Sequence, residues 1–226
     1  MKTRTLKFLF TAAMAMTLAS CGGETKLEKT YITFITVGEK AAVFEKNYDG
    51  QKATFSLESV KTNSDAQLAL KWYSFSTGED GQETKTALED GPIDAGRYLI
   101  EISAAETKKF TARTVESEFQ IKAAALPESW VTKAADFPEK LGFTKSGSGR
   151  NVRRTADADQ VAALKTKITV KDDQNKTWVL DTDYSITVTV SSDTVARVAV
   201  NSLTNKNYTN YSFQMTAEEI VPDPGE

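Results

Sequence analysis

The chain contains no histidine, and this absence excludes several classes of enzyme at once. Histidine is the most common general base near neutral pH and the most common protein ligand of metal ions. The Ser-His-Asp and Cys-His arrangements of hydrolases, and most zinc sites, need it as well. We therefore predict a protein that is not an enzyme, with no metal site and no cofactor.

Cysteine is nearly absent, because the 226 residues include only Cys21. No disulfide can form within the chain, so its fold must depend on hydrophobic cores. Positive charge is also sparse: the formal net charge is −3 at pH 7, and the densest cationic runs, residues 108–109 and 150–154, are short. A nucleic-acid surface needs an extended basic patch, so we do not expect nucleic acid as a partner.

The N-terminus carries the most specific pattern in the sequence. Lys2, Arg4 and Lys7 come before an apolar run over residues 8–19. This run is shorter than the roughly 20 residues that a membrane-spanning helix needs. A basic start, a short apolar segment and small residues before a cleavage site are typical of a secretory signal peptide, which we predict at residues 1–20.

Residues 18–22 read LASCG, which resembles the lipobox of bacterial lipoproteins. The resemblance implies cleavage before Cys21 and diacylation of its sulfur, so that the N-terminal lipid attaches the protein to a membrane. An ordinary secretory signal that happens to contain a cysteine is the alternative. Gly22 is not the aspartate of an inner-membrane retention signal, so we expect an exported protein on the outer membrane, facing the surface or the periplasm.

After residue 30 apolar and polar residues alternate, which is the pattern of half-buried β-strands. The predicted strands are rich in β-branched and aromatic residues and lie at residues 31–37, 54–58, 68–75, 97–103, 115–123, 165–170, 183–190, 196–201 and 212–215. One or two helical turns are expected within residues 158–167. The sequence therefore predicts an all-β fold and not an alternation of strands and helices.

Two aromatic residues in the first half favour a particular β-sandwich. Trp72 lies in the middle of a predicted strand, and Tyr98 lies at the start of a later one. In immunoglobulin-like sandwiches a buried tryptophan packs near the centre, and such a tyrosine folds its hydroxyl back onto the backbone at a corner. Ile100 occupies the position where antibody domains have a disulfide cysteine. Two unrelated core aromatics are the alternative interpretation.

The second half repeats the pattern of the first. Residues 196–201 align with residues 96–101, and residues 212–215 align with residues 118–121. The strand at residues 183–190 takes the place of residues 68–75. The repeat predicts two tandem immunoglobulin-like antiparallel sandwiches of about 95 residues each.

Several short motifs resemble the MBG domains of the YDG type, which are bacterial extracellular repeat modules. They are the segments 48–50, 92–98 and 119–121 in the first half, and 183–190, 196–200, 207–209 and Phe213 in the second. The second half departs from the family, because it lacks a Tyr-Asp-Gly motif and the proline and glycine before Arg197. The resemblance implies a spacer or adhesive role without catalysis.

These patterns divide the chain into five segments. They are a signal peptide at 1–20, the lipidated Cys21 and a spacer at 21–30, a first sandwich at 31–124, a divergent second sandwich at 125–221, and a disordered tail at 222–226. The boundary is placed near Pro127, because proline cannot continue a strand ladder.

The leading hypothesis is a non-enzymatic surface lipoprotein that acts as a spacer or an adhesion module. Its expected partners are the membrane, through the N-terminal lipid, and glycans or cell-surface proteins. The alternative is a carbohydrate-binding lipoprotein that captures glycans with exposed aromatic rings, for which the candidate residues are Trp130, Trp178, Tyr208 and Tyr211. The interpretation that we favour for these rings is that they close the ends of the sandwich core, as amphipathic aromatic side chains often do. The acidic pairs at residues 79–80, 89–90, 172–173 and 218–219 are interpreted as solvated turns.

Overall fold

A computed structural model describes residues 26–79 and 81–221. This part of the chain is built mainly from β-strands, together with one α-helix, α1 (Ala158–Lys165), and three 3-10 helices, Leu57–Ser59, Glu128–Trp130 and Gly149–Asn151. The prediction of an all-β fold is confirmed. The predicted signal peptide, Cys21 and the tail at residues 222–226 lie outside the described residues and stay predictions. None of the helices in the described ranges is long and apolar enough to cross a membrane.

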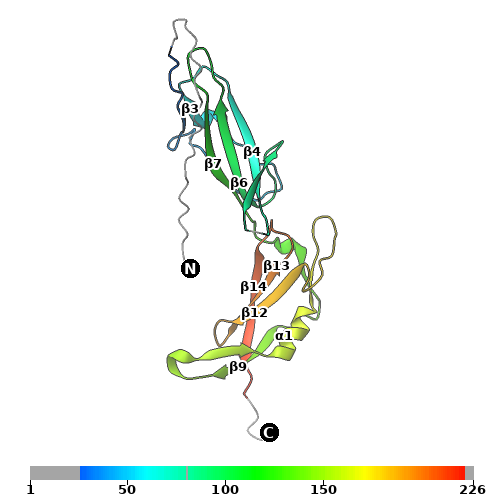
Figure 1. The fold of residues 1–226 in the computed structure, drawn as a ribbon. Helices are drawn as coiled ribbons and strands as arrows, with labels where there is room; N and C mark the ends of the chain where they lie inside the picture. Colours follow the sequence, from blue (N-terminus) through cyan, green and yellow to red (C-terminus); the bar gives the residue numbers. More distant parts are fainter. Residues whose placement is uncertain (1–25, 80, 222–226) are drawn as a thin grey trace.

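The first half of the chain forms a lobe organised around a five-stranded sheet (Figure 1). In spatial order its strands are β2 (Glu45–Asn47), β7 (Arg113–Lys122), β6 (Gly96–Ala104), β4 (Leu68–Thr77) and β5 (Glu83–Leu88). All neighbours are antiparallel except β2, which runs parallel to β7. A two-stranded sheet of β1 (Ile32–Phe34) and β3 (Val60–Thr62) shares the same hydrophobic core, so the lobe is sandwich-like.

The alternation along residues 97–103 predicts that Tyr98, Ile100 and Ile102 face the core and that Leu99 faces outward, but Leu99 is buried as well. Tyr98, Ile100 and Ile102 are buried, and Ile100 lies opposite Trp72 in the pairing of β6 with β4. The ring of Trp72 meets the ring of Phe119 edge-on, with the ring centres 5.0 Å apart. The hydroxyl of Tyr98 donates a hydrogen bond to the carbonyl oxygen of Asp94 at 2.8 Å, so the predicted tyrosine corner is present.

The second half forms a lobe with a related arrangement. Its five-stranded sheet has the order β10 (Arg153–Ala156), β9 (Lys140–Ser146), β14 (Asn210–Glu219), β13 (Val195–Ser202) and β12 (Tyr184–Val190). Strand β9 runs parallel to β14, and the other neighbours are antiparallel. A two-stranded sheet pairs β8 (Val131–Lys133) with β11 (Ile168–Val170).

The two sheets share an internal strand order. In the first lobe it is β2-β7-β6-β4, and in the second it is β9-β14-β13-β12, so the strands that the sequence repeat aligned occupy equivalent places. The lobes differ at the sheet edges, where β5 lies beside β4 in the first lobe and β10 lies beside β9 in the second. The two halves of the chain therefore differ in which edge of the sheet carries the fifth strand.

The structure corrects some of the predicted strand limits. The strand expected at residues 31–37 is confined to Ile32–Phe34, and residues 54–58 form no strand but lead into the 3-10 helix Leu57–Ser59. Strands β2, β3, β5, β8, β9 and β10 were not predicted from the sequence. Strand β5 reads ETKTAL and is exposed over most of its length. Without a buried face it lacks the alternation that identifies a strand.

Helix α1 lies within the predicted helical segment and contributes one fully buried side chain, Leu164, to the second core. Its first turn is stabilised by Asp157, whose carboxylate accepts a hydrogen bond from the Gln160 amide at 2.8 Å. Such an N-cap satisfies a backbone donor that has no partner inside the helix. The helix is thus a short covering element in a β structure.

The buried apolar side chains form two separate clusters. One cluster and its packed neighbours lie within residues 32–123, and the other lies within residues 126–217. The gap between them falls at residues 124–125. Figure 1 shows the lobes end to end, with the blue start of the coloured ribbon at the far end of the first lobe and the end of β14 at the far end of the second. The described chain therefore begins and finishes at opposite ends of an elongated molecule.

Candidate functional site: the junction between the lobes

The connection between the lobes is hydrogen-bonded into the second lobe. The amide of Ala124 donates to the carbonyl oxygen of Asn207 at 2.9 Å. The carbonyl oxygen of Ala124 accepts hydrogen bonds from the amide of Thr209 at 2.7 Å and from its hydroxyl at 3.1 Å. These bonds make Ala124 and Tyr208 partners in a parallel β-bridge. The backbone of the connection is therefore held in place and does not behave as a free linker.

Asn207 joins the same turn directly to the first lobe. Its Oδ1 accepts a hydrogen bond from the amide of Ala95 at 2.6 Å, and its Nδ2 donates to Oδ1 of Asp94 at 3.0 Å. The donor and the acceptor of the side-chain amide are both used, so a reversed amide would lose both bonds. Lys206 adds a long ion pair to Asp94, with 3.8 Å between Nζ and Oδ2, but both side chains are more than half exposed and the pair contributes little.

The part of the first lobe that Asn207 contacts is rigidly held. Asp94, whose carboxylate receives Asn207, uses its carbonyl oxygen to accept the hydroxyl of Tyr98 in the tyrosine corner. Burial of the ring, with the nearby negative charge of Asp94, raises the pKa of Tyr98 above its ordinary value. The hydroxyl therefore stays protonated and remains a donor. The junction is built on the corner that fixes the start of β6.

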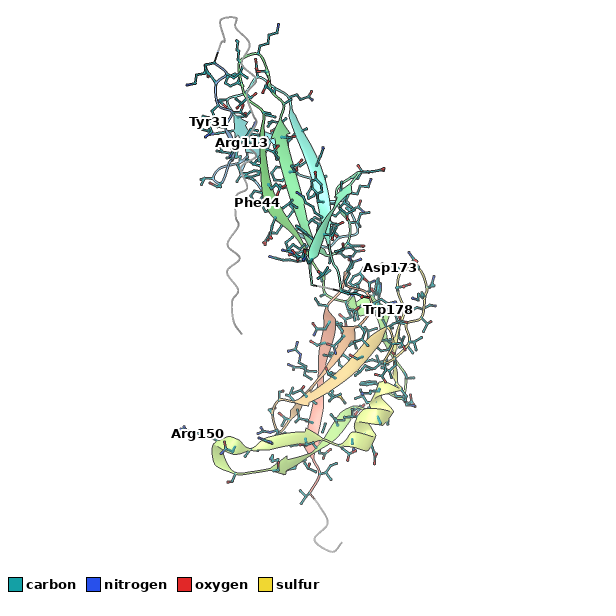
Figure 2. All side chains as sticks on the ribbon, in the orientation of Figure 1. Tyr31, Phe44, Arg113, Arg150, Asp173 and Trp178 are labelled. Atoms are coloured by element: carbon teal, nitrogen blue, oxygen red, sulfur yellow. The ribbon has the colours of Figure 1, made fainter. Side chains whose placement is uncertain are left out.

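Aromatic rings form a row that crosses the junction. Tyr48 of the first lobe meets Tyr208 with ring centres 5.4 Å apart, and Tyr208 meets Trp130 at 4.7 Å. Trp130 then meets Trp178 at 5.7 Å. All three contacts are steep, edge-type arrangements, in which the positive edge of one ring approaches the negative face of another. Figure 2 shows Trp178 at the end of the second lobe that adjoins the first.

Two neighbouring carboxylates accept hydrogen bonds from the indoles. Trp130 Nε1 donates to Oδ1 of Asp173 at 2.6 Å, and Trp178 Nε1 donates to Oδ2 of Asp172 at 3.2 Å. Burial acts to raise the pKa of Asp172, but the hydrogen bonds from Trp178 and from two backbone amides outweigh it and lower the pKa. This acidic pair lies in a turn in which Asp173 is exposed, and its carboxylates also bind the N–H groups of two core side chains.

The structure assigns the predicted ligand-binding aromatics to the interior. Trp130 and Trp178 are each only 6% exposed, so the expectation of a solvent-exposed platform at these rings is wrong. Large rings bury more area inside the lobe than a flat surface contact would bury, and Asp172 and Asp173 supply the partners that their N–H groups need.

The two predicted tyrosines have separate environments. Tyr208 is half-buried and belongs to the row of rings, in which it contacts Trp130. Tyr211 lies outside this row: its hydroxyl donates to Oε1 of Glu128 at 2.8 Å, and its ring adjoins Phe213. The structure thus brings Trp130, Trp178 and Tyr208 together as an internal cluster and leaves Tyr211 apart.

Sequence reasoning did not identify Asn207 or Asp94 as junction residues. Neither belongs to a motif with known chemistry, and 113 positions separate them in the chain. One feature of the sequence did indicate that the lobes touch: few residues separate the end of β7 at Lys122 from the 3-10 helix that begins at Glu128. A connection of that length keeps the ends of two lobes close enough to touch.

The described surface also carries two grooves and several exposed ion pairs. Two shallow grooves of about 270 and 200 Å³ lie beside residues 39–59 and beside α1, away from the junction. The described residues contain no group of three or more side chains that could hold a metal ion. Among the remaining acidic pairs, Asp90 binds Lys52, Glu218 binds Lys140 and Glu219 binds Lys145 in exposed ion pairs.

Comparison with known proteins adds no functional residue to the junction. No protein family matches the chain, and no curated protein is similar to it in sequence. The hydrogen bonds and ring contacts between the lobes are therefore the features from which a function can be inferred.

Proposed function

We propose that this protein is a non-enzymatic bacterial surface lipoprotein, and that its two lobes are tandem immunoglobulin-like modules acting as a spacer or adhesion element. The lipobox-like pattern around Cys21 supports membrane attachment. The observation that carries the spacer role is Asn207, whose side chain hydrogen-bonds to the first lobe from the second. A spacer must hold its ends apart, and a bonded junction does this where a flexible linker would not.

The form of each lobe supports the immunoglobulin-like assignment. The first lobe combines the buried Trp72, the Tyr98 corner and a strand, β2, that runs parallel to the last strand of its sheet. In the second lobe β9 runs parallel to β14 in the same way, and the buried Tyr184 donates to the carbonyl oxygen of Ile168 at 2.9 Å. Such modules are commonly used on cell surfaces as repeated structural units.

The spacer role predicts that Asn207→Ala loosens the molecule without unfolding it. The substitution removes two hydrogen bonds across the junction, each worth about 0.5–1.5 kcal/mol net. The population of molecules with separated lobes should rise roughly tenfold or more. Small-angle X-ray scattering of residues 22–226 should show an elongated, two-lobed particle before the substitution and a broader distribution of lobe distances after it.

Asn210→Ala is the matched control, because it makes the same chemical change three positions away. The Asn210 side chain is exposed, and within the described chain it forms no hydrogen bond. Its scattering curve should equal that of the unchanged protein. A compact globular particle, or identical curves for the Asn207 and Asn210 variants, would contradict the fixed-spacer proposal.

The anchor is tested separately. Mass spectrometry of the native protein should find an acylated N-terminal cysteine at position 21, and the protein should partition into detergent with the membrane fraction. Cys21→Ser should abolish acylation, because serine offers no sulfur for the thioether, and the protein should lose its membrane attachment. An unacylated mature N-terminus at another residue would contradict the lipoprotein proposal.

A further inference from the structure

The far end of the first lobe is built from three chain segments, which we call the distal end: residues 26–30, 63–67 and 105–113. Glu28 joins two of them, since its amide donates to the carbonyl oxygen of Lys109 at 2.7 Å and its carbonyl oxygen accepts the amide of Thr111 at 2.9 Å. Asn63 joins the third segment to residues 26–30, since its Nδ2 donates to the carbonyl oxygen of Lys29 at 3.1 Å. At about 3.3 Å per residue, the nine residues of β6 place this end about 30 Å from the tyrosine corner at the junction.

The distal end carries charge of the opposite sign to the chain as a whole. Its five cations are all exposed: Lys26, Lys29, Lys108, Lys109 and Arg113. Its acids are Glu28, Asp65 and Glu106, so cations are in excess here although the formal net charge of the chain is −3. Figure 2 shows Arg113 and Tyr31 in the upper part of the first lobe, away from Trp178 and Asp173.

These five cations have no ion-pair partner within the described residues. Elsewhere in the first lobe most cations are paired within the molecule: Lys85 pairs with Glu116, and Arg97 pairs with both Glu83 and Glu118. Among the described residues of this lobe, Lys61 and Lys71 are the exceptions, and they lie singly on strands β3 and β4. An ion pair within the protein satisfies a cation and reduces its attraction for external anions. The unpaired cations of the distal end remain free to bind anions supplied from outside.

The chain connects this end to the predicted lipid. Lys26, the first described residue, lies five positions after Cys21. Even a fully extended segment of that length spans at most about 18 Å. With an acylated Cys21, Lys26 at the distal end would lie within about 18 Å of the membrane surface, which is about two Debye lengths at physiological salt.

We propose that the distal end is a membrane-facing surface whose lysines and arginine bind the phosphates of anionic lipid headgroups. This inference rests on the lipid anchor of the proposed function for its orientation, and it adds the chemistry of the contact. Clusters of lysine and arginine close to a bilayer bind anionic lipids in this way. The contact directs the first lobe toward the bilayer and the second lobe away from it.

Vesicle binding by residues 22–226 tests the surface without the lipid. This chain contains both hydrophobic clusters, which lie within residues 32–217, so it includes every residue that forms the two cores. At low salt it should co-float with phosphatidylcholine vesicles containing about 30 mol% phosphatidylglycerol and should not co-float with pure phosphatidylcholine vesicles. Raising the sodium chloride concentration should release it, because salt screens the attraction.

A charge-reversed pair and a matched control locate the contact. Lys108→Glu with Lys109→Glu should weaken binding to the anionic vesicles by roughly tenfold or more. Arg150→Glu with Arg153→Glu makes the same change in net charge on the exposed β9–β10 hairpin of the second lobe, and should leave binding within about twofold. Figure 2 shows Arg150 far from the first lobe.

Equal loss of binding in both charge-reversed proteins would show a response to net charge alone and would overturn the proposal. Absence of binding to anionic vesicles at low salt would overturn it as well. Both results are distinguishable from failure of the proposed function, because the tested chain lacks Cys21. Acylation at Cys21 and an elongated scattering profile would still stand, and only the headgroup contact would be lost.

Discussion

Replacing Trp130 with alanine is expected to lower the free energy of unfolding of the second lobe by about 3–5 kcal/mol. The ring is 6% exposed and lies between Tyr208 and Trp178, with ring centres 4.7 and 5.7 Å away. Removing it leaves a cavity and deprives Asp173 of the indole N–H that it accepts at 2.6 Å. Urea unfolding followed by circular dichroism should show the loss as a lower midpoint of the transition that belongs to the second lobe.

Trp130→Phe separates the ring from its hydrogen bond. Phenylalanine retains most of the aromatic area but has no N–H for Asp173, so the expected loss is smaller, about 1–3 kcal/mol. A loss below about 1 kcal/mol for Trp130→Ala would mean that the ring is exposed in solution. In that case the glycan-binding alternative, which needs exposed indoles, would again be open.

Replacing Trp72 with alanine is expected to remove about 3–5 kcal/mol from the stability of the first lobe. Trp72 is 5% exposed in the centre of β4, where it lies opposite Ile100 and meets Phe119 edge-on. Since this lobe has no disulfide to limit its unfolded state, losing the central ring removes a large part of a typical domain stability of 5–15 kcal/mol. The measurement is the urea midpoint of the transition that belongs to the first lobe.

Tyr98→Phe is the conservative comparison for the same core. It keeps the buried ring and removes only the hydroxyl that donates to Asp94 at 2.8 Å, so a loss of about 1 kcal/mol is expected. If Trp72→Ala costs no more than Tyr98→Phe, the tryptophan is not the centre of the core. The strand faces assigned to β4 and β6 would then be wrong.

Together the two tryptophan substitutions show how far the lobes depend on each other. The clusters share no residue, so each alanine should act mainly on its own lobe. The lobes are nevertheless joined through Asn207 and through the contact of Tyr48 with Tyr208. A shift of the unmutated lobe by up to about 1–3 kcal/mol would measure what these contacts contribute.

Long alternating segments allowed the centre of each lobe to be predicted. The strand pattern around Tyr98, Ile100 and Ile102 has a period of two, and it placed all three side chains in the core as observed. Strand β12 lies in the segment predicted to alternate, and on it Tyr184 and Ile186 are buried while the residues beside them on the other face are polar. A central strand must bury one face, so its residues alternate between apolar and polar.

Edge strands could not be predicted in the same way. Strand β5 is exposed over most of its length and β2 is a short polar segment, EKN, whose pairing depends on β7 far along the chain. Such strands are stabilised by backbone hydrogen bonds that any residue except proline can make. Their side chains therefore carry no periodic signal.

The burial of the aromatic rings at the candidate site could not be predicted from the sequence either. The sequence singled out Trp130, Trp178 and Tyr208 as aromatic residues in irregular segments, but it left open whether the rings face solvent or core. Their burial follows from contacts with one another and from the carboxylates of Asp172 and Asp173, and Asp173 lies 43 positions from its partner Trp130. No local pattern around any of these rings encodes that arrangement.

The sequence alone determined that the chain is all-β, that its pattern repeats, and that hydrophobic burial without a disulfide must stabilise it, because period, composition and residue counts are local properties. Tertiary structure alone decided that Asn207 holds the lobes together through Asp94 and Ala95, and that unpaired cations gather at the distal end. The physical reason is that hydrogen bonds and charge clusters depend on which distant segments the fold brings within a few ångströms, and spacing along the chain does not specify those distances.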